Sequence, residues 1–251
     1  MIDMPDKTDK PAPELFSFGE HFGGLLAISE TSAKQFAESA RAIAAIFEGV
    51  ARDFARSYPQ MEAATDRLAD LGWTIPMLGT PRTFVELADP SYSDSKIGAM
   101  LLDFYADADY ELLRTIQGDI LKAPLFAPWR ELLNETFEAF FRGHYQIVVP
   151  ALLMVTEGVV AIESSAAFPP DRIKVVDRVT QIQSQQRPQS IEALMWRSLQ
   201  RWIAHLFQNS QFSGTPPARL NRHWILHGRD AGPWTATDAT RLFASLHMLS
   251  S

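Results

Sequence analysis

Cysteine is absent from this chain of 251 residues, which excludes disulfide bonds and thiolate metal ligands. A chain without cysteine suits a reducing compartment, and we expect a cytoplasmic protein. The N-terminal stretch MIDMPDKTDKPAPE contains no apolar run, so it does not resemble a secretory signal. The most apolar run, residues 147–162, includes Pro150 and Glu157 and falls short of the roughly 20 residues that a membrane span needs. We therefore predict no membrane association.

Several catalytic signatures are also missing from the sequence. It contains no glycine-rich phosphate loop, no HExxH zinc motif and no serine-nucleophile elbow. His223 and His227 share a helix face that could hold zinc, but Asp230 is the only nearby carboxylate with suitable spacing to add a ligand. We therefore predict no metal site and no cofactor.

Strand-like alternation is scarce, whereas hydrophobic residues make up 46% of the chain and recur at helical spacing. The sequence therefore predicts an all-α fold. Residues 145–164 are apolar almost all round and are expected to form a central buried helix. A short helix is expected to start with Thr215 as its N-cap and Pro216 in its first turn, and to stop at Gly228. The other predicted helices cover residues 32–58, 61–71, 93–105, 109–121, 129–142, 171–186, 190–208 and 235–249.

A break in the helical pattern, bracketed by Pro124 and Pro128, suggests a domain boundary. We predict a flexible tail over residues 1–15, a helical accessory region over 16–123 and a helical domain over 124–251.

Acidic residues are rare in one part of this acidic chain. The net charge is −7, yet residues 172–229 hold nine basic and only two acidic side chains. Such a segment either presents positive charge to an anion such as nucleic acid or places its arginines on solvated helix faces. Within it, aromatic and basic residues alternate as they do on RNA-stacking surfaces, although the spacing of the two tryptophans puts at least one in the core. These residues are Trp196, Arg197, Arg201 and Trp202.

The same segment contains the string LNRHWILHGR, residues 220–229, in which Arg222 and His227 lie five positions apart. Spacing alone does not single out this pair, because Arg241 and His247 are spaced similarly. Context separates the two pairs. Arg222 is followed by the polar His223 in a short helix of the basic segment, whereas Arg241 belongs to an ordinary amphipathic helix.

The string R-H-W-I-L-H resembles the R-(N/H/D)-x-x-x-H signature of the HEPN superfamily, and the likeness covers the helix order from about Trp129 onward. The resemblance implies a HEPN-type helical bundle that acts on RNA as a metal-independent endoribonuclease. It also implies a toxin or antiviral effector that forms a homodimer and has an antitoxin or defence-system partner protein. Arg222, His223 and His227 would be its catalytic residues. One toxin subset has tyrosine two places after the histidine, where this chain has Arg229.

An arginine and a histidine suit RNA cleavage. The 2′-hydroxyl of RNA is an internal nucleophile, so the enzyme needs only a proton shuttle near neutral pH and a cation for the phosphate. The expected products are a 2′,3′-cyclic phosphate and a 5′-hydroxyl. Residues five apart on an α-helix point about 140° apart. Either a second chain completes the site across a twofold axis, or the flexible arginine closes the gap within one chain.

Glu157 is the sole carboxylate of its apolar stretch and is expected to be a buried acid that is either paired or uncharged. It either orients Arg222 or His227 or serves as a structural hydrogen-bonding partner. His144 and Tyr145 either line the same cleft or form a helix junction. The predicted substrate-binding residues are Arg201, Arg219, Arg229 and Glu157.

Two other functions stay open at this level. The first is a non-catalytic helical binding or scaffold module, in which Arg222 and His227 tie the last helices together. The second is a partner-binding protein that uses the apolar seam from Phe36 to Phe54, although such a seam is normally core.

Overall fold

The computed structural model describes residues 30–165, 175–209, 213–215 and 217–250. The chain divides into two compact units, Met1–Phe54 and Ala55–Ser251. Every regular element of the described residues is a helix, so the predicted all-α fold is confirmed. No described helix combines the length and apolar character needed to cross a bilayer.

Helix α2 (Glu30–Asp70) begins in the first unit and ends in the second. It runs through Pro59, so the prediction of two helices that meet there is wrong. A proline inside a helix costs about 3 kcal/mol. Burial of Met61 and Leu68 beyond it offsets that cost, since each large apolar side chain contributes about 1.5 to 3 kcal/mol. Most side chains of the predicted apolar seam, from Phe36 to Val50, lie outside the described residues.

Helix α4 (Asp94–Lys122) begins after the N-cap Ser93, whose hydroxyl accepts a hydrogen bond from the Lys96 N–H at 3.3 Å. Its two halves agree with the predicted helices over 93–105 and 109–121. Residues 107–110 leave the helical conformation, and three of them are left-handed: Ala108, Asp109 and Tyr110 have φ values of 48°, 54° and 63°. The Tyr110 ring packs on Phe140 and Phe141, which ties this break to the helix beside it. The short helix α3 (Pro81–Leu87) was not predicted.

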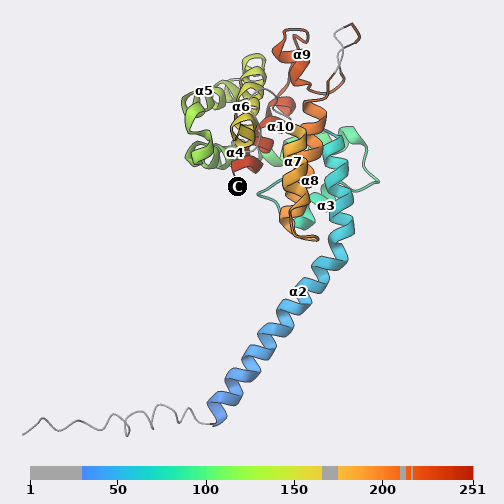
Figure 1. Ribbon diagram of the computed structural model, residues 1–251, viewed down its shortest axis with the longest axis vertical. Coiled ribbons are helices and arrows are strands. Elements are labelled where there is room, and N and C mark those ends of the chain that lie inside the picture. The colour runs from blue at the N-terminus through green and yellow to red at the C-terminus, as the bar shows by residue number, and fades with distance from the viewer. Residues whose placement is uncertain (1–29, 166–174, 210–212, 216, 251) are drawn as a thin grey trace, which may run out of the picture. The chain divides into compact units, whose positions relative to one another are not determined.

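The core of the second unit forms where α5 (Arg130–Phe141), α6 (Tyr145–Ser165) and α10 (Ala236–Ser250) pack with α4 (Figure 1). Phe137 and Phe243 stack there with ring centroids 4.0 Å apart. A 3-10 turn, η1 (Pro124–Trp129), occupies the predicted break before α5. Helix α6 is buried on one side only, because Ile147 and Met154 are 61% and 50% exposed. The prediction that it is buried all round is therefore wrong.

Helices α7 (Val175–Ser184) and α8 (Ile191–Leu206) pack together beside this core. Three carboxylates of α2 face three basic side chains of α8, and both sets recur every four residues. Arg197 binds both carboxylate oxygens of Asp66, each at 2.7 Å. The remaining contacts are Arg197 with Glu62 at 2.8 Å, Arg201 with Asp66 at 3.5 Å, Arg201 with Asp70 at 2.9 Å, and His205 with Asp70 at 3.4 Å. We call this set the α2–α8 charge ladder.

Helix α9 (Arg222–Leu226) is shorter than predicted. Its N-cap is Asn221, whose side-chain oxygen accepts a hydrogen bond from the Trp224 N–H at 3.2 Å. Thr215 lies outside any helix, so its predicted capping role is wrong, and Pro216 is outside the described residues. Gly228 follows the helix with φ of +66°, the left-handed conformation that favours glycine, as predicted for the stop.

Helix α10 begins with the predicted capping pair. Asp238 accepts hydrogen bonds from both the N–H and the hydroxyl of Thr235 at 2.9 Å. Helix α10 also packs on α4, which precedes the predicted boundary between residues 123 and 124. That boundary stays a prediction about domain organisation.

Candidate functional site

The motif residues lie at one end of the second unit, on the single turn of α9 (Figure 1). Arg222 is the first residue of this helix and His227 is its C-cap. The His227 N–H donates to the His223 carbonyl at 3.3 Å, and this turn brings the two imidazoles together. Their ring centroids lie 4.6 Å apart in an edge-to-face arrangement. His227 is exposed and His223 is half-buried, so the pair can be reached from solvent.

Arg222 is held from two directions. Its Nη1 lies 2.9 Å from Glu157 Oε1 of α6, and its guanidinium carbon lies 5.0 Å from the ring centre of Phe207. Both members of the ion pair keep contact with water, with side-chain exposures of 28% and 38%. A pair of this exposure contributes about 1 kcal/mol or less to stability. It therefore orients Arg222 more than it stabilises the fold.

Glu157 does not have the environment expected from its sequence. Its neighbours along the chain are apolar, yet its side chain is 38% exposed, so the prediction of a buried acid is wrong. Helical geometry explains the difference, because Glu157 follows the exposed Met154 by three positions on the open side of α6. The pairing expected of Glu157 is present, with Arg222 as its partner.

Gly158, the next residue, sets how closely η1 approaches α6. A methyl group added at Gly158 would overlap Trp129 Cζ2, so only glycine permits this contact. The ring of Trp129 therefore lies directly against the helix turn that carries Glu157.

The electrostatic surroundings of His223 disfavour its charged form. The pKa of His223 lies below its ordinary value, first because of desolvation and then because of the positive charges of His227 and Arg222. His223 is consequently neutral at pH 7 and able to accept a proton. Two titratable groups in contact, with one disfavoured in its charged form, form an arrangement suited to acid and base roles.

The remaining predicted residues are dispersed. Arg201 is drawn into the α2–α8 charge ladder through Asp70. Arg229 is exposed just beyond α9, where its N–H donates to the Trp224 carbonyl at 2.8 Å. Arg219 is also exposed and lines a different recess. Of the seven predicted site residues, the structure thus brings together Arg222, His223, His227 and Glu157.

Two other residues singled out in the sequence, Tyr145 and Trp202, take part in packing between helices. The Tyr145 ring packs near Phe140, with centroids 5.5 Å apart, at the junction of α5 and α6. Trp202 is buried, as expected for at least one of the two tryptophans. Phe207 was not singled out, although it contacts Arg222. It lies fifteen positions before Arg222 across a polar linker, so no periodicity could have connected the two.

The chain matches no protein-family model, no curated protein and no solved structure. The likeness of the motif to the HEPN signature therefore rests on its own residues.

Metal ligands do not gather in the described part of the second unit. No group of three or more histidine, aspartate or glutamate side chains there has the geometry to hold a metal ion.

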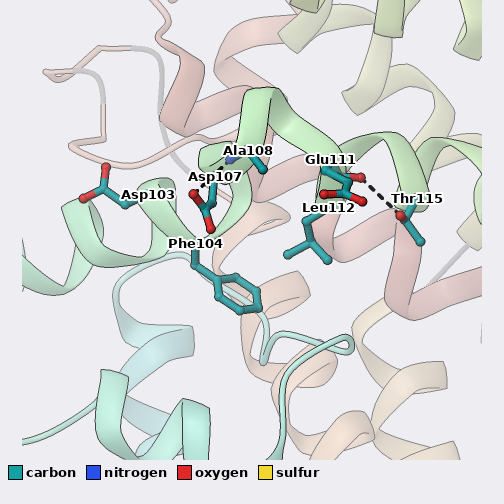
Figure 2. A pocket seen from close by; sticks show the side chains of 7 residues that line it. All are labelled: Asp103, Phe104, Asp107, Ala108, Glu111, Leu112 and Thr115. Atoms are coloured by element: carbon teal, nitrogen blue, oxygen red, sulfur yellow. Dashed lines mark hydrogen bonds between the residues drawn. The ribbon is translucent and has the colours of Figure 1, made fainter.

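A wide hollow of about 620 Å³ lies elsewhere, along the break in α4 (Figure 2). Figure 2 shows three carboxylates around it, those of Asp103, Asp107 and Glu111. Negative charge of this kind repels phosphate groups, so the hollow does not suit RNA.

Proposed function

We propose that this protein is a metal-independent endoribonuclease of HEPN type, with its site on α9. The observation that carries the proposal is the joint placement of a carboxylate-oriented arginine and two contacting, solvent-accessible imidazoles on one helical turn. Lewis-acid chemistry is not required for this reaction, because the 2′-hydroxyl of RNA supplies the nucleophile. The toxin or antiviral role and the partner protein belong to the same proposal.

Each motif side chain has a role in the proposed reaction. Neutral His223 accepts the proton of the 2′-hydroxyl while the oxygen bonds to phosphorus. Protonated His227 donates a proton to the leaving 5′-oxygen as the P–O5′ bond breaks, which leaves a 2′,3′-cyclic phosphate and a 5′-hydroxyl. Arg222 binds the non-bridging oxygens, whose negative charge grows in the transition state. Glu157 positions the Arg222 guanidinium, while Arg201, Arg219 and Arg229 supply more distant positive charge to the RNA backbone.

A homodimer is part of the proposal. Large apolar side chains are exposed on both helices that carry the site: Ile147 and Met154 on α6, and Leu226 on α9. The two helices pack on each other, so these side chains supply apolar area beside the motif. A twofold axis through this surface would bring two copies of the motif together.

The test is cleavage of mixed RNA by the purified full chain in EDTA. We expect cleavage by the unmutated protein and a loss of at least about 100-fold in Arg222→Ala and His227→Ala, the usual effect of removing a positioned acid, base or charge. Arg187→Ala and His144→Ala are matched controls, because these side chains are exposed and lie outside the site. The 3′ ends should carry cyclic phosphate. Equal activity of motif and control variants would contradict the proposal.

A second candidate follows from the Arg222–Glu157 ion pair itself, which joins α9 to α6. In a non-catalytic binding or scaffold module, this pair would serve only to fix α9. Arg222→Ala would then lower the melting temperature while the unmutated protein cleaves no RNA. In the nuclease, Arg222→Ala keeps a near-native melting temperature and loses cleavage.

A further inference from the structure

A second cluster of basic side chains lies where the end of α8, the segment before α9 and the first half of α10 meet. A narrow notch of about 20 Å³ is lined by His205, Arg219 and Arg241. A recess of about 250 Å³ adjoins it, since both cavities are lined by His205, Arg219 and Leu220. From the sequence, Arg241 was expected to belong to an ordinary amphipathic helix.

Arg241 has an unsatisfied donor at this place. Its Nη1 lies 3.3 Å from Asp238 Oδ1, and its guanidinium carbon lies 5.2 Å from the ring centre of Trp73. Its Nε is buried and has no hydrogen-bonding partner in the protein. An unpaired buried donor costs about 1 to 3 kcal/mol, so Arg241 is held beside the notch at a cost to stability.

The two arginines also repel each other. Burial first, and then the positive charge of Arg219, lower the pKa of Arg241, while Asp238 acts in the opposite direction. The structure gives Arg219 no carboxylate partner among the described residues, and its side chain is exposed. An anion between the two guanidinium groups would relieve this repulsion.

The dimensions indicate what kind of anion fits. About 20 Å³ is room for one oxygen-sized group, and the adjoining recess holds the rest of a larger ion. A tetrahedral oxyanion directs its oxygens toward several sides at once. It can therefore meet donors on both sides of the junction, and the arginine fork suits phosphate oxygens.

We infer that His205, Arg219 and Arg241 form a phosphate-binding site, in which one oxygen enters the notch beside Arg241 and the others meet Arg219 and His205 in the recess. His205 contacts Asp70 through a long 3.4 Å interaction, so its ring can also turn toward an anion. The site is separate from the imidazole pair of α9 and shares Arg219 alone with the residues proposed to bind RNA.

The test is calorimetric titration of inorganic phosphate into the full chain at constant ionic strength, with acetate and AMP in parallel. We expect phosphate to bind more tightly than acetate. Arg219→Ala should weaken phosphate binding about tenfold or more, the effect of losing one charge-assisted hydrogen bond. Arg219→Lys should recover part of it. Arg187→Ala is the matched control, since it removes an exposed arginine of the same basic segment.

The outcomes separate this site from the proposed nuclease. Arg222→Ala should retain the phosphate-binding event that Arg219→Ala loses, whatever its effect on RNA cleavage. AMP that binds more tightly than phosphate would identify an ester as the ligand, and equal affinity would identify the free anion. The inference is overturned if the unmutated protein binds no phosphate, if acetate binds equally well, or if Arg187→Ala and Arg219→Ala lose the same affinity.

Discussion

The pKa of His247 depends on its surroundings in the folded protein. It is the buried one among the described histidines, and its Nε2 lies 3.1 Å from Asp119 Oδ2. This contact joins α10 to α4. Burial lowers the pKa of His247, and Asp119 opposes that effect only in part. Arg241 and His247 are spaced in the sequence much like Arg222 and His227, but their side chains have different partners. Arg241 contacts Asp238, whereas His247 contacts Asp119.

We expect stability to depend on pH through His247. Because its pKa is lower in the folded protein than its ordinary value of 6.5, the unfolded chain binds a proton more readily. The free energy of unfolding should therefore fall as the pH drops below about 6.5, and should not depend on this group above that value. Chemical denaturation of the unmutated protein and of His247→Gln at pH 5.5 to 7.5 measures the effect. A pH slope that is the same in both proteins would contradict it.

At the scale of a helix, the left-handed turn inside α4 stores conformational energy. A left-handed residue other than glycine costs about 1 to 2 kcal/mol. Ala108 is exposed, and its N–H donates to Asp107 Oδ1 at 2.9 Å, so its methyl group is not needed for packing. The aromatic contacts of Tyr110 retain the turn nonetheless.

Ala108→Gly should stabilise the protein by about 1 kcal/mol, because glycine adopts positive φ without a steric penalty. Ala106→Gly, two residues earlier in helical backbone, should destabilise it by about 0.5 to 1 kcal/mol. Thermal unfolding of both variants checks the pair. A loss of stability in Ala108→Gly similar to that in Ala106→Gly would indicate that residue 108 is helical in solution.

The helices could be predicted to within a few residues because apolar spacing and caps act locally. Periodicity located α5, α8 and α10, and the Thr235 and Asp238 capping pair was visible in the sequence. Two misses depended on tertiary structure. Pro59 stays helical because the residues after it are buried, and the start of α9 depends on Asn221, whose side-chain amide is also anchored on the Gln208 carbonyl at 2.8 Å.

The candidate site was only partly predictable for a similar reason. Arg222, His223 and His227 are neighbours in the sequence, so their proximity required no tertiary information. The contacts that position Arg222 come from α6 and from the end of α8, and only Glu157 drew attention, as a carboxylate in an apolar run. The ion pair of Arg201 with Asp70 could not be predicted, because the two residues lie 131 positions apart in the sequence.

At the scale of the whole molecule, the exposed row on α6 leads to a prediction about assembly. Met154→Glu should convert the proposed dimer to monomer, since a charge placed in an apolar interface must be desolvated. Light scattering after size-exclusion chromatography measures the mass. Leu78→Glu is a matched control, because Leu78 is 43% exposed and lies outside α6 and α9. An unmutated protein that is monomeric throughout the accessible concentration range would remove the dimer from the proposal.

The α2–α8 charge ladder fixes the register of two parallel helices. The carboxylates and the basic side chains both recur every four residues. If one helix moved along the other by a full turn, some ion pairs would form again, but one carboxylate and one basic side chain at opposite ends would lose their partners. A shift of one or two residues would point the basic side chains of α8 away from the carboxylates of α2. Two of the nine basic residues of the basic segment, Arg197 and Arg201, thus set alignment inside the protein, whereas exposed arginines of the same segment, among them Arg187, Arg219 and Arg229, are available to anions from outside.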